Sequence, residues 1–248
     1  MIIDILTLFP EMFTGIIESS IIKRAKENGF VSINIHDFRQ YSNKPNKRVD
    51  DYSYGGGAGM IISVQPIVDC LKQIPNYNKA KKILTTPSGI KYDQNKAFEL
   101  AKEEHIIIIC GHYEGIDDRI THYIDEEISI GDYILTGGEI ATLAIFDSIT
   151  RLIPGVLGNE ESTEVESFDE GLLEYPQYTR PQVYDNYKVP DVLISGHHEN
   201  IRNFRHRMSL KKTYEKRKDL LDKLLLSKED LEYIESLKQK KDLDEYEN

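Results

Sequence analysis

The fold is decided by residues 105–115, which read His-Ile-Ile-Ile-Ile-Cys-Gly-His-Tyr-Glu-Gly. Four consecutive isoleucines followed by a cysteine are typical of a strand that is buried on both faces, as in the middle of a parallel sheet. A loop with glycines at both ends, residues 111–115, follows this strand directly. The pattern predicts a central strand whose carboxyl end opens into a loop suited to ligand binding.

Strands and helices are expected to alternate on both sides of this stretch. We expect further strands at residues 2–8, 31–35, 81–86 and 128–130, and helices at residues 19–28, 64–73, 93–102 and 138–152. The strand at 81–86 is expected to end at Pro87-Ser88-Gly89, and residues 39–60 are expected to form a long loop. This alternation predicts an α/β fold with a mostly parallel sheet and helices on both faces.

The composition is that of a protein with a packed core. Of the 248 residues, 40% are hydrophobic and 29% are charged. The longest apolar run, residues 106–110, is far shorter than the roughly 20 residues of a membrane span, and residues 1–10 do not resemble a signal peptide. The two cysteines, Cys70 and Cys110, form neither a disulfide framework nor a zinc site of their own. We therefore expect a cytoplasmic protein with no membrane partner.

The pattern changes after Pro154, where the chain becomes irregular, acidic and aromatic. Residues 209–241 are charged and helical in pattern, with Ser227 and Asp230 as an expected capping pair. We therefore predict an α/β domain at residues 1–157, an interdomain linker at 158–176 and a small helical domain at 177–248.

The net charge of −11 argues against a nucleic-acid partner, but the charge is unevenly distributed. Residues 197–218, here called the basic block, contain eight lysines and arginines and lie between two acidic stretches. Arg202, Arg205 and Arg207, together with Arg180 before the block, offer bidentate donors to phosphate. We favour an RNA-contacting surface over a merely solvated helix face.

Three glycine-bearing loops each follow an expected strand, at residues 87–89, 111–115 and 131–138. The carboxyl ends of parallel strands share one edge of a sheet, so these loops are expected to meet and to hold a small molecule. The alternative is a set of ordinary turns, with Tyr133 in the core and His112 an exposed loop residue.

A separate glycine cluster reads Gly55-Gly56-Gly57-Ala58-Gly59. It is not a phosphate-binding loop of the Walker type, because no Gly-Lys-Ser/Thr follows, and its spacing does not fit the dinucleotide fingerprint. Two interpretations stay open: a flexible loop, or backbone that approaches a ligand or partner where a Cβ would clash.

These residues together resemble the bacterial tRNA (guanine-N1)-methyltransferases of the SPOUT superfamily. The resemblance runs through most of the chain in order. Its motifs are Leu8-Phe9-Pro10-Glu11-Met12-Phe13, Val49-Asp50-Asp51, Tyr54-Gly55-Gly56-Gly57, Val64-Gln65-Pro66, Tyr113-Glu114-Gly115-Ile116-Asp117, Ser129-Ile130-Gly131-Asp132-Tyr133, Gly137-Gly138-Glu139, Ile153-Pro154-Gly155-Val156-Leu157-Gly158, Gly171-Leu172-Leu173, Tyr178-Thr179-Arg180-Pro181 and Leu193-Ile194-Ser195-Gly196.

The resemblance implies a SPOUT-type fold with a deep trefoil knot, an obligate homodimer with shared active sites, and S-adenosylmethionine bound at the knot. It also implies a divalent ion, Mg²⁺, for which the sequence shows no clustered ligand set. The implied cofactor contacts are Pro87, Gly89, Gly111, Glu114, Ile130, Gly131, Asp132, Tyr133, Ile134, Leu135, Gly137 and Gly138. The implied tRNA contacts are Asp50, Gly55, Gly56, Gly57, Arg180, Arg202 and Arg205.

The implied reaction is methylation of N1 of guanosine 37, just 3′ of the anticodon. By resemblance, Glu166 removes the N1 proton as general base and Arg151 stabilises the charge that develops on O6. Two positions depart from the family pattern. Glu166 stands where members have aspartate, while nearby Asp169 does not align, and His112 stands where several members have arginine.

Two other functions are considered beside this one. A non-catalytic RNA-binding protein on the same fold would result if glutamate at position 166 disables the base. An enzyme that binds a nucleoside triphosphate through the glycine cluster is the other, against which the absence of a Walker lysine speaks.

Overall fold

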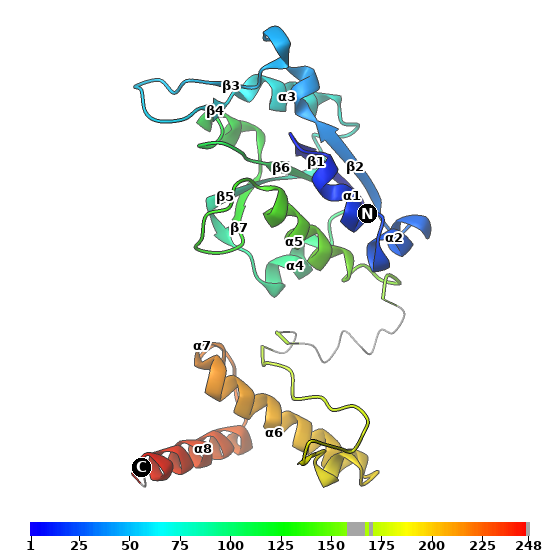
Figure 1. Cartoon of the computed structure of the whole chain (residues 1–248), viewed down its shortest axis with the longest axis vertical. Helices are drawn as coiled ribbons and strands as arrows, with labels where there is room; N and C mark the ends of the chain where they lie inside the picture. The colour runs from blue at the N-terminus through cyan, green and yellow to red at the C-terminus, as the bar shows by residue number, and fades with distance from the viewer. Residues whose placement is uncertain (158–166, 169–170, 247–248) are drawn as a thin grey trace. The chain divides into compact units, whose positions relative to one another are not determined.

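The computed structural model of the protein describes residues 1–157, 167–168 and 171–246. The chain divides into two compact units, Met1–Glu160 and Glu161–Asn248 (Figure 1). The first unit is an α/β domain and the second is mainly helical. The domain and linker boundaries expected from the sequence stay a prediction, because residues 158–166 lie outside the described part of the chain.

A five-stranded sheet forms the centre of the first unit, with the order β2-β1-β6-β5-β7. Every pair of neighbouring strands is parallel, which confirms the expected sheet. The isoleucine run forms the middle strand β6 and is almost fully buried. The strands are β1 (Ile2–Thr7), β2 (Ser32–Asp37), β5 (Lys81–Lys91), β6 (His105–Cys110) and β7 (Glu126–Ser129).

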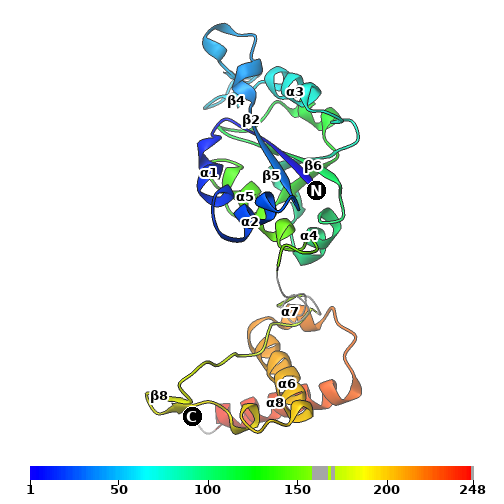
Figure 2. The ribbon, with the colours of Figure 1, turned by 90° about the vertical axis from the view of Figure 1, so that its right-hand side faces the viewer.

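Helices cover both faces of this sheet (Figure 2). Alternate residues of a strand point to opposite faces, so Ile3 and Ile5 of β1 pack with Phe13 and Phe146, while Leu6 packs with Ile67 of α3. The core on the first side takes residues from α1 (Glu11–Ile17), α2 (Ser20–Glu27), α4 (Gln94–Leu100) and α5 (Glu139–Thr150), and the opposite core takes residues from α3 (Val64–Gln73).

Strand β5 corrects one prediction from the sequence. It does not end at Pro87-Ser88-Gly89 but runs on to Lys91, with a register shift against β7 between Thr85 and Ile90. Gly89 permits this course, because a Cβ there would lie 2.4 Å from the backbone nitrogen of Ile128. The expected turn is therefore an irregularity inside a longer strand, of the kind that re-aims neighbouring residues.

The expected loop at residues 39–60 contains local structure. Two short 3₁₀ turns, η1 (Phe38–Tyr41) and η2 (Pro45–Lys47), precede β3 (Asp50–Asp51), which pairs antiparallel with β4 (Ile61–Ile62). The glycine cluster therefore lies in the connection between two short paired strands, and in Figure 1 this connection projects from the domain.

The second unit packs three helices around Leu210, Tyr214, Leu221 and Ile234. The first of them begins at His198, well before the predicted start near residue 209. The amide of Asp230 donates to Ser227 Oγ, and the amide of Ser227 donates back to Asp230, which confirms the expected cap. The elements are β8 (Val183–Tyr184), β9 (Tyr187–Lys188), η5 (Asp191–Leu193), α6 (His198–Lys216), α7 (Lys218–Leu221) and α8 (Lys228–Tyr246).

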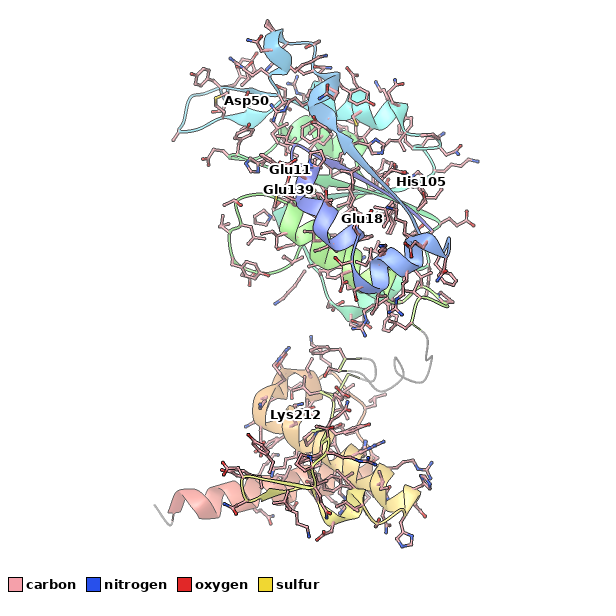
Figure 3. The ribbon with its side chains drawn as sticks, turned by 45° about the vertical axis from the view of Figure 1, so that its right-hand side comes forward. Glu11, Glu18, Asp50, His105, Glu139 and Lys212 are labelled. Atoms are coloured by element: carbon pink, nitrogen blue, oxygen red, sulfur yellow. The ribbon has the colours of Figure 1, made fainter. Side chains whose placement is uncertain are left out.

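Within the second unit, residues 173 and 174 are hydrogen-bonded to α6. The backbone amide of Leu173 donates to Thr213 Oγ1 at 2.9 Å, and Lys212 Nζ donates to the carbonyl of Glu174 at 2.8 Å. Lys212 is labelled in Figure 3. Within the part of the chain that the structure describes, no helix is long and apolar enough to cross a membrane.

Candidate active site

A cavity of about 450 Å³ lies where the ends of β6 and β7 meet the irregular stretch of β5. Residues from the irregular stretch of β5 (Pro87 and Ser88) and from the loops at 111–115 and 131–138 line it, with further contributions from η3 (Asp118–Tyr123) and the start of α5. Its volume lies within the roughly 300–1,000 Å³ of small-molecule sites. The position, at the carboxyl ends of parallel strands, is the one expected of a ligand site in an open α/β sheet.

Ten of the twelve expected cofactor contacts line this cavity. Gly89 does not, because it lies in β5 and is packed against the backbone of β7, and Asp132 does not either, although both of its neighbours do. The ten are Pro87, Gly111, Glu114, Ile130, Gly131, Tyr133, Ile134, Leu135, Gly137 and Gly138.

Two interpretations of single loop residues were wrong. His112 is not a freely exposed loop residue, because it is half-buried in the cavity wall. Tyr133 is not in the core, since it is 55% exposed at the cavity. Neither placement could be predicted from the sequence. Both depend on how the loop at 131–138 folds back over the loop at 111–115.

Glycine backbone holds these two loops together. The amide of Gly138 donates to the carbonyl of Gly111 at 2.7 Å, and His112 and Gly137 form an isolated antiparallel bridge. A Cβ on Gly138 would lie 2.2 Å from Thr85 Oγ1 and 2.9 Å from the Gly111 nitrogen. The three chain segments therefore meet closely at this point. The trefoil knot implied for this region stays a prediction.

The lining of the cavity fits an amphipathic cation better than a polyphosphate. Aliphatic side chains such as Leu84, Ile128 and Leu135 form part of the wall, and Glu114, Asp118 and Glu127 contribute carboxylates. None of the described lining residues is a lysine or an arginine. S-adenosylmethionine carries a flat aromatic adenine, a sulfonium and an ammonium group, which match the aliphatic wall and the carboxylates. A triphosphate would bring several negative charges to the same acids.

The two cysteines do not act as nucleophiles here. Burial, reinforced by the negative charges of Asp37 and Asp4, raises the pKa of Cys70 to about 12. Burial also raises the pKa of Cys110 well above its ordinary value, although a hydrogen bond with Thr142 opposes the shift. Both therefore stay protonated at neutral pH, and a reactive thiolate is unavailable at the cavity.

The end of the glycine cluster that leads into β4 lies against the cavity wall. The amide of Glu114 donates to the carbonyl of Met60 at 3.2 Å, and a Cβ on Gly59 would lie 2.4 Å from the Glu114 side chain. Tyr54, at the other end, is fully exposed. Gly55, Gly56 and Gly57 have φ of 86°, 79° and 133°, which side-chain-bearing residues rarely adopt. The loop therefore presents backbone to solvent beside the cavity.

A model of the family described as tRNA (Guanine-1)-methyltransferase TrmD matches residues 1–223. The chain belongs to this family. Three relatives, each named tRNA (guanine-N(1)-)-methyltransferase, illustrate the similarity. Those from Clostridium acetobutylicum and Halalkalibacterium halodurans are 57% and 52% identical to the chain, over 92% and 97% of it and 94% and 99% of their own length. That from Bacillus cereus strain B4264 is 52% identical over 95% of the chain and 98% of the relative.

Arg151, one of the two proposed reacting residues, does not line the cavity of its own chain. Arg151 follows α5 directly, whereas Gly138, at the opposite end of that helix, lines the cavity. At 1.5 Å per residue, these positions are about 20 Å apart along the helix axis. Glu166, and Asp169 with it, lies outside the described residues.

The tRNA contacts implied by the family fall in both units. Asp50, labelled in Figure 3, lies in β3 at the base of the glycine loop, and its carboxylate is 3.5 Å from Arg48 Nε. Arg202 and Arg205 are exposed on α6, and Arg180 is exposed before the β8–β9 hairpin. The Arg205 guanidinium lies over the Tyr175 ring at 4.8 Å. Among the described residues, Arg202 forms no ion pair.

A metal centre is not apparent in the described part of the chain. No three histidine, cysteine, aspartate or glutamate side chains converge there as ligands. The divalent ion implied by the resemblance stays a prediction.

Proposed function

We propose that the protein methylates N1 of guanosine 37 in tRNA, using S-adenosylmethionine bound in the 450 Å³ cavity. Membership of the methyltransferase family supports the reaction class. The observation that carries the site is the cavity itself, which collects ten of the twelve family cofactor positions and three carboxylates without a lysine or arginine among its described lining.

The cofactor, when bound, supplies a methyl group on a positively charged sulfur. The carboxylates of Glu114, Asp118 and Glu127 favour its cationic groups, and aliphatic side chains cover its heterocycle. Glycine backbone in loops 111–115 and 131–138 approaches closely and leaves peptide groups available as hydrogen-bond partners. These residues position the methyl group, which is the main requirement for an in-line transfer.

Glu166 and Arg151 act on the guanine. N1 carries a proton at neutral pH, so a carboxylate within hydrogen-bond distance must accept it as the new bond forms. We assign this step to Glu166, whose side chain is one methylene longer than the aspartate of other family members. The negative charge that develops on O6 is stabilised by the guanidinium of Arg151.

The active site is shared between two copies of the chain. Arg151 lies about 15 Å along α5 from Ala141, the nearest residue of this helix that lines the cavity, which is farther than an arginine side chain extends. This distance is bridged in a homodimer in which the Arg151 end of α5 in one subunit lies at the cavity of the other. Two-fold symmetry then produces two equivalent sites, each with a cavity from one subunit and Arg151 from its partner.

Subunit mixing tests this arrangement. Arg151→Ala impairs one part of each site, and Gly138→Ala is expected to block the cavity. In mixed dimers, one site carries both defects and the other carries neither. Unfolding and refolding the two inactive variants together should restore about a quarter of the wild-type activity, because half of the dimers are mixed and each has one intact site. No recovery in verified mixed dimers would assign Arg151 and the cavity to the same subunit.

The tRNA is held by two surfaces in this proposal. The backbone of Gly55, Gly56 and Gly57, with Asp50 at the base of the loop, faces the nucleotides near the cavity. Arg180, Arg202 and Arg205 of the second unit bind phosphates of the stem. Since the substrate is tRNA and both cysteines are free, we expect the protein to act in the cytoplasm.

The direct experiment is methyl transfer to an unmodified tRNA transcript. The transcript is incubated with the protein and S-adenosylmethionine and digested, and the modified nucleoside is mapped by mass spectrometry. One added methyl group on N1 of guanosine 37 is the expected product. Tight binding of tRNA without any methyl incorporation would instead indicate a non-catalytic RNA-binding protein.

A further inference from the structure

His112 has one packed side and one accessible edge. Its ring lies 4.8 Å from the Phe9 ring and 5.0 Å from the Tyr113 ring. Nδ1 is buried and has no hydrogen-bond partner within the described residues. The side chain as a whole is 23% exposed and lines the cavity. Among the described residues Nε2 forms no hydrogen bond, and it is not one of the buried atoms without a partner, so Nε2 lies on the accessible edge of the ring.

The buried nitrogen faces a buried carboxylate. Glu139 is the first residue of α5 and is only 2% exposed, and its Oε2 lies 4.0 Å from His112 Nδ1. Its Oε1 accepts a 2.9 Å hydrogen bond from Thr7 Oγ1. Glu139 is labelled in Figure 3. A separation of 4.0 Å is within ion-pair distance but is too long for a hydrogen bond. A small movement of the ring would allow Nδ1–H to donate to the carboxylate, as often happens when an apo site closes on its ligand.

Gly137 makes this approach possible. A Cβ on Gly137 would lie 2.3 Å from Glu139 Oε2 and 2.5 Å from His112 Nδ1. The backbone bridge between His112 and Gly137 fixes the loop at the same point. Any larger residue at position 137 would therefore separate the imidazole from the carboxylate. The absence of a side chain at position 137 therefore leaves the space in which the imidazole and the carboxylate approach each other.

The charged side chains that line the cavity indicate what the pair of His112 and Glu139 can bind. The described lining contains carboxylates from the loop after β6 (Glu114), from η3 (Asp118) and from β7 (Glu127), but no lysine or arginine. S-adenosylmethionine brings a carboxylate of its own besides its two cationic groups. Of the described lining residues, His112 is the one whose side chain can carry a positive charge to meet it. An imidazolium donates from both ring nitrogens, so His112 in that form would direct Nδ1–H to the carboxylate of Glu139 and Nε2–H into the cavity.

We infer that His112, as an imidazolium, binds the carboxylate of S-adenosylmethionine through Nε2–H, and that Glu139 is the positioning residue that orients its ring. This inference rests on the proposed function, because it assigns a contact to the cofactor of that reaction.

Two ligands that differ in the amino-acid part test the assignment by calorimetry on the full chain. S-adenosylhomocysteine has the carboxylate, and 5′-methylthioadenosine lacks it along with the ammonium group. His112→Asn keeps an amide near the place of Nδ1 but does not reach that of Nε2. We expect it to weaken S-adenosylhomocysteine binding about tenfold or more, the worth of a charge-assisted hydrogen bond. Binding of 5′-methylthioadenosine should change by less than about twofold. His122→Asn, outside the cavity, is the matched control.

Rescue and coupling separate this role from a structural one. His112→Arg should restore S-adenosylhomocysteine affinity and keep it constant as the pH rises, whereas wild-type affinity should fall once the imidazolium loses its proton. Glu139→Gln should weaken S-adenosylhomocysteine binding in the wild-type background and add nothing to His112→Asn. Equal losses for both ligands, or an unchanged affinity in His112→Asn, would overturn the inference. If the wild-type protein binds neither ligand, the proposed function fails, and this inference fails with it.

Discussion

The backbone N–H of Gly138 donates to the carbonyl oxygen of Gly111 across 2.7 Å, which ties the loop after β7 to the loop after β6. Both glycines line the cavity, and the first turn of α5 begins immediately after Gly138. The hydrogen bond therefore couples the shape of the cavity to the packing of a core helix.

Gly138→Ala should disrupt this junction. The added Cβ would lie 2.9 Å from the backbone nitrogen of Gly111 and 3.0 Å from the Cα of Cys110, atoms that cannot move independently of the strand. Overpacking of this kind costs about 1–3 kcal/mol, and we expect cofactor affinity to fall at least about tenfold as the loops separate. Urea unfolding and S-adenosylhomocysteine calorimetry measure the two effects.

Gly15→Ala is the control for that substitution. Gly15 lies inside α1, its φ is not positive, and a Cβ there would meet no atom within 4 Å. Alanine is the better helix former, so this variant should be at least as stable as the wild type. A Gly138→Ala variant that unfolds and binds like Gly15→Ala would show that the close contact at Gly138 is readily relieved.

The sequence predicted the strands better than it predicted their contacts. The isoleucine run of β6 and the helix at 64–73 were placed correctly, since burial and helical periodicity are local signals. The predicted end of β5 came too early, because a Pro-Ser-Gly run normally ends a strand. The close approach of Gly89 to Ile128 shows that this strand continues. The meeting of His112 with Glu139 was not predictable either. It depends on the close approach of the loops 111–115 and 131–138 at Gly137, and the hydrophobic periodicity of a sequence does not predict contacts between loops.

Asp4 in the middle of β1 should be an important stabilising group. Its side chain is 3% exposed and accepts hydrogen bonds from His36 of β2 at 2.5 Å and from His105 of β6, labelled in Figure 3, at 2.6 Å. Burial by itself raises the pKa of Asp4, but the two histidines outweigh it and hold the pKa below 3.8. Asp4→Asn should cost about 2 kcal/mol at pH 7, the range for a hydrogen bond to a charged group.

The sign of the pH effect follows from the lowered pKa. The folded state binds the Asp4 proton less tightly than the unfolded state does, so the stabilisation is present above about pH 4, near the unfolded pKa. It is lost as the pH falls through the folded pKa. Urea unfolding should therefore show a gap between wild type and Asp4→Asn at pH 7 that narrows below pH 4. The exposed Asp147→Asn is the control, and a gap that stays constant with pH would assign the effect to packing.

Binding of tRNA should depend on salt despite the net charge of −11. Arg202 and Arg205 are exposed on α6, where their charges are available to phosphates. Replacing both with alanine should weaken tRNA binding and reduce the slope of log affinity against log salt by about 1–2 units, while cofactor affinity is retained. Lys23→Ala with Arg24→Ala on α2 removes the same charge from the other unit. If both double variants lose affinity equally, the effect comes from net charge and α6 is not the RNA surface.

Glu166 provides the sharpest test of the reaction. Glu166→Gln keeps the shape of the side chain but cannot accept the N1 proton, so methyl transfer should fall by roughly two to four orders of magnitude, the usual worth of a general base. Glu166→Asp restores the residue of other family members and should retain substantial activity. Cofactor affinity should hardly change in either variant, since Glu166 lies outside the three glycine loops. Single-turnover transfer to tRNA transcript measures the chemical step, and calorimetry with S-adenosylhomocysteine measures the affinity.

Combining the substitutions tests whether Glu166 and Arg151 act on the same transition state. Arg151→Ala should also be severely impaired, because the charge on O6 loses its partner. Residues that act as a unit are non-additive, so Glu166→Gln with Arg151→Ala should lose less than the product of the two separate rate reductions. Asp169→Asn is the matched control in the same segment and should transfer methyl at nearly the parent rate. If Asp169→Asn is inactive while Glu166→Gln is not, Asp169 is the base and the alignment of this segment to the family must shift.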